Sequence, residues 1–167
     1  MRYLWIFIVL IGACSSPTGP DEQAIGTEAG QLAPPIISTT ISGESFDLYA
    51  LKGDFILLDF WGSWCGPCIR EAPQIVALHN DFKDKGLTIV SIAIEKNDKN
   101  VAKAARQLGY VWENQLVEES RYVRFNPIAS AYDVTEIPSL FLIDPEGKIT
   151  LSKTTIAEVR EKLTASL

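Results

Sequence analysis

Two long apolar runs, separated by a segment with helical spacing, place the strongest constraint on how this chain folds. Residues 55–61 are apolar except for Asp59, and residues 87–94 form a second run of the same kind. A strand without polar alternation is typical of a parallel sheet that is buried on both faces. Between the runs, apolar side chains recur at helical spacing until Gly86, which predicts a helix that connects the two strands. The chain therefore predicts an α/β sheet covered on both faces.

The second half of the chain continues the alternation of helices and strands. Asn97 or Asp98 is predicted to cap a helix that ends at Gly109. Asn126 and Pro127 are predicted to begin a short helix, with the asparagine as its cap. The remaining elements are a third strand, the outer strand of a hairpin and a last helix that opens with a capping box, at residues 140–143, 148–151 and 155–163.

Cys65 and Cys68 lie between the first strand and its helix, in the motif Trp-Cys-Gly-Pro-Cys. A helix N-terminus lowers the pKa of a thiol, because free N–H groups and partial positive charge stabilise the thiolate. Half a zinc site and a short structural disulfide are the alternatives. A zinc site needs about four ligands, and the chain offers one other cysteine and one histidine, His79. The spacing beside a β-α-β pattern therefore predicts a redox-active pair.

The first residues have the features of a secretory signal peptide. Arg2 precedes an apolar run at residues 3–11, which is far shorter than the about twenty residues that cross a bilayer. The run ends in Ile-Gly-Ala-Cys, which resembles a bacterial lipobox, and the alternative is an ordinary signal with a chance cysteine. We expect residues 1–13 to be removed and Cys14 to carry lipid, which also accounts for the odd third cysteine.

Polar residues 14–30 predict a flexible tether, and residues 31–167 predict a single domain. The chain has a formal net charge of −6 and no basic cluster. This charge argues against nucleic-acid binding and against adhesion to anionic headgroups. Any membrane attachment is therefore expected to come from the lipid.

Several segments together resemble the TlpA/ResA type of extracytoplasmic thiol–disulfide reductases. The resemblance covers residues 43–60 as the lead-in, residues 60–73 as the active-site strand, elbow and kinked helix, and residues 126–147 as the second half. It implies a thioredoxin fold, in which a central mixed sheet is flanked by helices. It also implies an N-terminal β extension and a central insertion at residues 109–125.

The two thiols and two nearby acids are expected to carry the reaction. Cys65 is expected to face solvent and attack a client disulfide, and the less exposed Cys68 to resolve the mixed disulfide. By resemblance, Asp59 matches a buried thioredoxin acid that exchanges a proton with the inner cysteine; an exposed carboxylate on a half-buried strand is the alternative. Glu71 matches a glutamate that tunes the thiols in ResA-type reductases, although a surface acid near a helix start explains it equally well.

Client contacts are expected around the same motif. Pro138 resembles the family's cis-proline, which would leave the backbone of Ile137 free to pair with an extended client; a trans proline in a plain loop is the alternative. Trp64, next to the attacking thiol, is expected to touch the client together with Gly66 and Pro67.

The remaining aromatic residues have less specific roles. Trp61 fits a core position or a client contact, and His79 is expected at the surface. The aromatic residues of the insertion are expected to pack it onto the sheet, although one of them could line the client groove: Tyr110, Trp112, Tyr122 and Phe125.

The predicted function is a membrane-anchored extracytoplasmic protein-disulfide oxidoreductase that reduces exported proteins, for example in cytochrome c maturation. Its expected partners are disulfide-containing clients and a membrane electron donor, and no metal or cofactor is expected beyond the Cys65–Cys68 disulfide. A copper carrier on the same fold is one alternative, but it would use wider cysteine spacing and a histidine near Pro138. A peroxiredoxin is another, but its Pro-x-x-x-Thr-x-x-Cys signature precedes neither cysteine.

Overall fold

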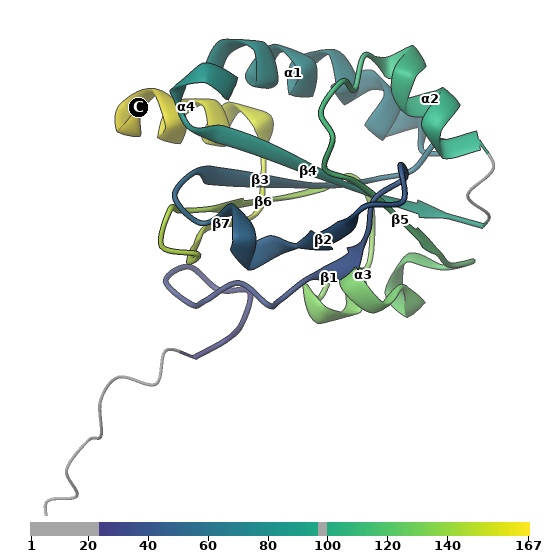
Figure 1. Cartoon of the computed structure of the whole chain (residues 1–167), viewed down its shortest axis with the longest axis horizontal. Coiled ribbons are helices and arrows are strands. Elements are labelled where there is room, and N and C mark those ends of the chain that lie inside the picture. Colours follow the sequence, from purple (N-terminus) through teal and green to yellow (C-terminus); the bar gives the residue numbers. More distant parts are fainter. Residues whose placement is uncertain (1–23, 97–99) are drawn as a thin grey trace, which may run out of the picture.

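A computed structural model describes residues 24–96 and 100–167. A five-stranded mixed sheet lies at its centre, with strand order β5-β4-β3-β6-β7 (Figure 1). The first three strands in that order are parallel, and β6 and β7 run antiparallel to their neighbours. The strands are β3 (Phe55–Trp61), β4 (Leu87–Glu95), β5 (Gln115–Glu119), β6 (Ser139–Ile143) and β7 (Ile149–Thr154).

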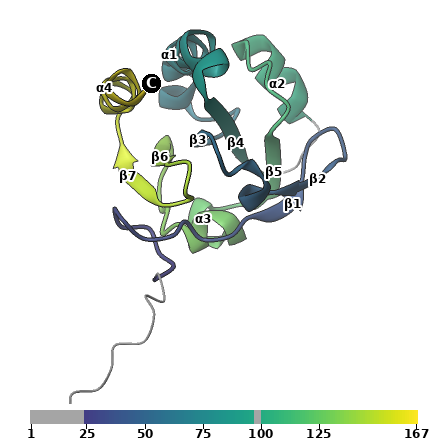
Figure 2. The same cartoon turned by 60° about the vertical axis from the view of Figure 1, so that its left-hand side comes forward.

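Helices and a small hairpin cover the two faces of the sheet (Figure 2). One face lies under α1 (Gly66–Phe82), α2 (Val101–Leu108) and α4 (Ile156–Ser166), and the other carries α3 (Pro127–Ala131) and the hairpin of β1 (Ile37–Thr39) and β2 (Ser45–Asp47). Three short 3₁₀ helices complete the described elements: η1 (Leu48–Leu51), η2 (Lys83–Lys85) and η4 (Val123–Phe125). The predicted α/β architecture is confirmed. The hairpin is the expected N-terminal β extension, and the expected insertion supplies the edge strand β5.

The side chains of β3 alternate between two cores, one on each face of the sheet. Leu57 and Trp61 join the core under α1, whereas Leu58 and Phe60 join the core on the opposite face. Asp59 has the same parity as Leu57 and Trp61, because successive side chains of a strand point to opposite faces. The single charge of this strand therefore enters the core beneath the helix that carries the cysteines.

Most of the predicted helix starts are confirmed. Thr155 and Glu158 form both hydrogen bonds of a capping box. Asn126 caps α3 by accepting a hydrogen bond from the backbone N–H of Ala129 at 2.8 Å. The predicted cap of α2 is wrong, because that helix begins after Asn100. Residues 97 and 98, which were expected to cap it, lie outside the described residues.

The folded part of the chain begins earlier than the tether prediction allows. The backbone N–H of Gly26 donates to the carbonyl of Leu32 at 2.9 Å, and that of Gly30 donates to Ile149 in β7 at 2.8 Å. Residues 24–30 are thus held against the sheet, because their backbone finds partners there. The predicted signal peptide and Cys14 lie outside the described residues, and no helix in the described part is long and apolar enough to cross a membrane.

The aromatic residues after α2 divide into buried and exposed pairs. Tyr110 and Trp112 are buried, as expected. Tyr122 and Phe125 are 54% and 65% exposed and pack against each other, which contradicts the prediction that they hold the insertion on the sheet. They follow the end of edge strand β5, where the chain runs over the surface.

His79 is half-buried rather than at the surface, because its ring packs on Trp112 with centroids 5.1 Å apart.

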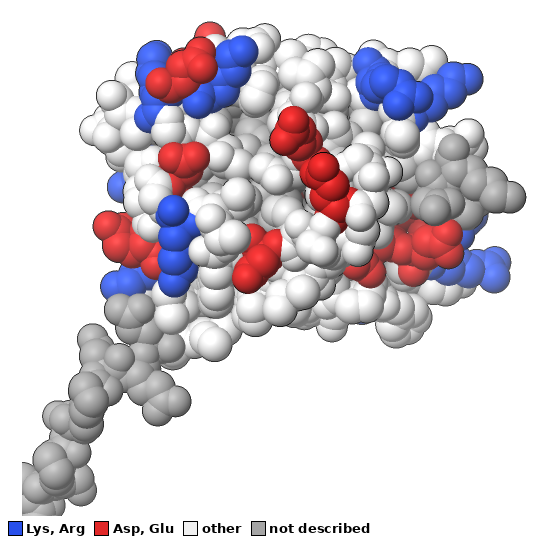
Figure 3. All heavy atoms as spheres, in the orientation of Figure 1, with Lys and Arg blue, Asp and Glu red and all other residues white. Residues whose placement is uncertain are grey.

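Charged side chains are scattered over the face seen in Figure 3. Small groups of Lys and Arg alternate with Asp and Glu, and uncharged surface separates them. This face therefore offers no continuous basic surface of the kind that binds nucleic acid.

Candidate active site

Cys65 and Cys68 form a disulfide at the start of α1, with an S–S distance of 2.09 Å. Cys65 is the N-cap of the helix, and its Sγ accepts a hydrogen bond from the backbone N–H of Cys68 at 3.2 Å. Pro67 occupies the first turn, where its missing N–H costs nothing. In the reduced protein the same N–H and the helix N-terminus would stabilise a thiolate on Cys65. This asymmetry supports Cys65 as the attacking thiol.

The expected difference in exposure between the two cysteines is not found in this disulfide form. Cys65 is 4% exposed and Cys68 is 3% exposed, so the prediction of a solvent-facing Cys65 is wrong here. The carbonyl oxygen of Ile137 lies 3.6 Å from Cys65 Sγ and covers it. The hydrogen bond to Cys65, rather than its exposure, therefore distinguishes the two sulfurs.

The loop between β3 and α1 is tied to the end of β4. Trp64 Nε1 donates to the carbonyl of Ile94 at 2.9 Å, and the backbone N–H of Ser63 donates to Glu95 Oε1 at 2.5 Å. Gly62 suits this close approach, because a Cβ there would lie 3.1 Å from the Ile94 carbonyl oxygen, which is a tight contact. The two hydrogen bonds and the close contact fix the loop that presents the cysteines.

Glu95 is a site residue that the sequence analysis missed. It is 7% exposed and is the last residue of β4, a strand with no other charged residue. A carboxylate at the end of a buried strand is costly without a hydrogen-bond donor. That position was the available signal, but the sequence does not say which backbone N–H would meet it.

The two tryptophans of the motif have different environments. Trp61 is 1% exposed and belongs to the core, whereas the Trp64 ring is 57% exposed beside the disulfide. Gly66 and Pro67, between the cysteines, are also exposed. Trp64, Gly66 and Pro67 thus present free surface to an incoming client, as their predicted role requires.

The Ile137–Pro138 peptide is cis, as predicted, and faces the cysteine pair. Pro138 lines two adjacent hollows of about 260 and 270 Å³. Glu71 lines the first of these hollows together with Pro138. The hollows give a client segment room beside the proline.

Asp59 is 2% exposed, which excludes an exposed position for its carboxylate. Ser91 Oγ donates to Asp59 Oδ2 at 3.2 Å, and the hydroxyl of Tyr110 also hydrogen-bonds the carboxyl. The pKa of Asp59 is raised to about 7, mainly by burial and in smaller part by the charge of Glu71, although the two hydrogen bonds act in the opposite direction. A carboxyl that titrates near neutral pH suits a proton acceptor.

Glu71 lies on α1, three residues after Cys68, and is half-buried. Its charge raises the pKa of both Asp59 and Tyr110, and its side chain lines the hollow at Pro138. The structure therefore brings both predicted acids to the α1 side of the sheet. Their roles in the reaction remain predictions.

The residues that the structure describes hold no group of three or more His, Cys, Asp or Glu side chains arranged to bind a metal ion.

A family model described as the AhpC/TSA family matches residues 29–152. The chain belongs to this family. A thiol-disulfide oxidoreductase ResA of Bacillus thuringiensis strain Al Hakam is 31% identical over 122 residues, which cover 73% of this chain and 67% of the relative. A second ResA, from Bacillus thuringiensis subsp. konkukian, is 30% identical over 153 residues, which cover 89% of this chain and 85% of the relative.

A solved structure with the same fold is the thioredoxin domain of a thiol-disulfide oxidoreductase from Bacteroides vulgatus. It is 29% identical, has a TM-score of 0.71, and the match covers 81% of this chain and 96% of that domain. The thioredoxin fold predicted from the motifs is therefore confirmed. With these relatives and its Cys65–Cys68 pair, the chain is a thioredoxin-like protein-disulfide oxidoreductase.

Proposed function

We propose that this oxidoreductase works as a reductase of disulfides in exported proteins. The observation that supports it best is the Cys65–Cys68 pair at the start of α1, where the backbone N–H of Cys68 donates a hydrogen bond to the Cys65 sulfur. The spacer of glycine and proline adds no cationic group that would stabilise the reduced form further. We expect this dithiol–disulfide pair to be reducing, with a reduction potential similar to that of thioredoxin, which is about −270 mV.

In the proposed reaction, the Cys65 thiolate attacks a client disulfide and forms a mixed disulfide with one client sulfur. The other client sulfur leaves as a thiolate and takes a proton. Cys68 then loses its proton, attacks Cys65 and releases the second client sulfur as a thiol. Two electrons pass from the dithiol to the client, and the Cys65–Cys68 disulfide is left for a membrane donor to reduce.

The client is proposed to lie across Pro138 and Trp64. The hollows lined by Pro138, the contact of the Ile137 carbonyl with Cys65 Sγ and the exposed ring of Trp64 support this placement. Apocytochrome c fits the proposal as a client, because its paired haem-attachment cysteines must be reduced before haem is added.

Single-cysteine variants test the proposed function. Cys68→Ser keeps the attacking thiol and should accumulate mixed disulfides with clients, visible on non-reducing gels and removed by reductant. Cys65→Ser should trap nothing and should abolish disulfide reduction. If only Cys65→Ser accumulated mixed disulfides, Cys68 would be the attacking thiol and Cys65 the resolving one. Equilibration of the purified pair with glutathione tests the direction, and a potential well above that of thioredoxin would contradict a reductase.

We also propose that Cys14 anchors the mature protein to a membrane through lipid. The proposal is supported by the Ile-Gly-Ala-Cys sequence behind a short apolar run. Mass spectrometry of the mature N-terminus should find acylated Cys14, and Cys14→Ser should release the protein from the membrane fraction. An unmodified N-terminus at another residue would contradict the anchor.

A further inference from the structure

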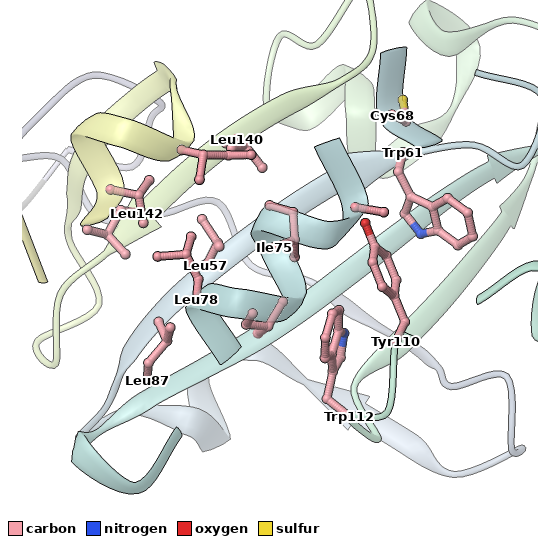
Figure 4. Packing of buried hydrophobic residues seen from close by; sticks show 14 of the residues in the cluster. Leu57, Trp61, Cys68, Ile75, Leu78, Leu87, Tyr110, Trp112, Leu140 and Leu142 are labelled. Atoms are coloured by element: carbon pink, nitrogen blue, oxygen red, sulfur yellow. The ribbon is translucent and has the colours of Figure 1, made fainter. Parts of the chain in front are cut away.

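The buried Asp59 has two hydrogen-bond partners that come from different parts of the chain. Ser91, its register partner on β4, donates to Oδ2 at 3.2 Å, and Tyr110, in the segment between α2 and β5, places its hydroxyl on the same carboxyl. Tyr110 is 3% exposed and packs between Trp61 and Trp112, with ring centroids 5.2 and 4.5 Å away. Figure 4 shows this stack, with the Tyr110 hydroxyl directed into the core under α1.

Trp112 determines the direction of the hydrogen bond from Ser91. Its Nε1 lies 3.1 Å from Ser91 Oγ. An indole N–H can only donate, so the serine oxygen accepts from Trp112 and its own proton remains for Asp59. Trp112 thereby orients the Ser91 hydroxyl toward the Asp59 carboxylate.

The segment that carries Tyr110 and Trp112 is itself held in shape. The side-chain amide of Gln115, at the start of β5, donates to the carbonyls of Tyr110 at 3.3 Å and Trp112 at 2.7 Å. The backbone N–H of Tyr110 donates to Ala105 in the last part of α2 at 3.0 Å. These bonds fix the loop, so both aromatic side chains enter the core beside Asp59.

We propose that Tyr110, directly, and Trp112, through Ser91, are positioning residues that keep Asp59 ready to take the proton of Cys68 during client release. This inference rests on the proposed disulfide exchange. It gives the segment after α2 a part in the chemistry, whereas its aromatic residues were expected mainly to pack the insertion onto the sheet.

The proposed role of Asp59 lies in the step that releases the client. In the mixed disulfide, the Cys68 thiol gives its proton to the Asp59 carboxylate, and the resulting thiolate attacks Cys65. The Cys65–Cys68 bond forms, the bond from Cys65 to the client sulfur breaks, and the client thiolate accepts a proton. The hydroxyls of Tyr110 and Ser91 stabilise the carboxylate form that must be present before the transfer.

Charged and titratable groups reach Asp59 from two elements. Glu71 acts on it from α1, and Tyr110 acts on it from the segment after α2, while β4 contributes the neutral Ser91. Burial and Glu71 raise the pKa of Asp59, and the two hydroxyl donors lower it. Removing either donor should therefore move its titration to higher pH.

The first experiment is a carbon-13 NMR titration of the Asp59 carboxyl in the oxidised protein, where neither cysteine titrates. The wild type should titrate near pH 7. Tyr110→Phe should shift the midpoint upward by roughly one pH unit, the size expected for losing one hydrogen bond to a charged group. Ser91→Ala and Trp112→Phe should shift it in the same direction, Trp112→Phe by less because its action is indirect.

Tyr132→Phe is the matched control. It removes another buried tyrosine hydroxyl, but Tyr132 belongs to the core on the opposite face and donates to Pro34. Its Asp59 midpoint should equal that of the wild type. Equal midpoints in Tyr110→Phe and wild type would overturn the positioning role, whether or not the proposed exchange is correct.

The second experiment measures the release step with a chromophoric aromatic disulfide, dithiobis-nitrobenzoate, in stopped flow. The reduced protein should release one thiol on attack by Cys65 and a second on attack by Cys68. The pH profile of the second phase should move upward in Tyr110→Phe by the same amount as the NMR midpoint. An NMR shift without a shift of this profile would overturn the link to release while leaving disulfide exchange itself intact. Loss of both phases in the wild type would instead contradict the proposed function.

Discussion

Each face of the central sheet has its own buried core, but the two cores contain different chemical groups. Under α1, the core contains the disulfide and the hydrogen-bonded carboxyl of Asp59. On the opposite face, Phe60, Tyr132 and Phe141 form an aromatic cluster with ring centroids 5.3 to 5.8 Å apart. Strand β3 contributes to both, because alternate residues point to opposite sides.

The two faces therefore differ in whether they bury a group that can ionise. Ionising a carboxyl in an apolar interior is unfavourable, so the helix-covered face carries a cost that grows with pH. In the aromatic cluster on the opposite face, the Tyr132 hydroxyl donates a hydrogen bond to the carbonyl oxygen of Pro34 at 2.6 Å. Both of these groups are uncharged. Stability should therefore depend on pH through one face and much less through the other.

The largest expected effect comes from Asp59→Asn. The pKa of Asp59 is raised from 3.8 to about 7 in the folded protein. Between these values the unfolded chain has lost the proton that the folded chain keeps, so the free energy of unfolding falls as pH rises through the window. The raised pKa corresponds to roughly 4 kcal/mol, all of it present below pH 3.8 and lost above about pH 7.

Asp59→Asn should remove this decrease in the free energy of unfolding. The variant should therefore become more stable relative to the wild type as the pH rises from acid to mildly alkaline values. Urea unfolding of both oxidised proteins across that range measures the difference directly. Parallel curves for the two proteins would mean that Asp59 ionises in the folded state as easily as in water, and the contrast between the faces would disappear.

An intermediate effect is expected from Tyr132→Phe on the opposite face. The substitution keeps the aromatic packing but leaves the buried carbonyl of Pro34 without its donor. An unsatisfied buried acceptor costs about 1 to 3 kcal/mol. Because no charge is involved, the loss should be the same at pH 5 and pH 8 in the same unfolding assay. A loss that varies with pH would show that this face also senses ionisation.

The smallest effect is expected from Glu71→Gln. The charge of Glu71 raises the pKa of Asp59, so its removal should move the region of falling stability toward lower pH. Glu146→Gln is the control, since it removes the same charge from an exposed position in the turn between β6 and β7. If both variants shift the stability curve equally, the effect reports net charge rather than the proximity of Glu71 to Asp59.

Several features of the site were predictable because they depend on neighbours in the sequence. The Cys65 cap follows from a thiol two residues before proline at a helix start, and the capping box at Thr155 needs a glutamate three residues later. The cis peptide at Pro138 was accessible by resemblance to a known family. The burial of Asp59 was expected by the same resemblance, with an exposed carboxylate as the alternative.

Other features depend on contacts between distant segments and could not be predicted. Glu95 meets the amide of Ser63 because β4 ends beside the loop after β3. The low exposure of Cys65 results from Ile137 folding across it. Residues 24–30 look like a linker in composition, yet β7 offers their backbone a partner.

The order of strands and helices and the redox pair could be predicted from the sequence, because local spacing and hydrophobicity encode these features. Which groups donate hydrogen bonds to Asp59 depends on the tertiary structure. Register places Ser91 beside Asp59, and the loop after α2 brings Tyr110 onto the same carboxyl. A hydrogen bond depends on positions in space to a fraction of an ångström, and sequence periodicity does not fix those positions across a sheet.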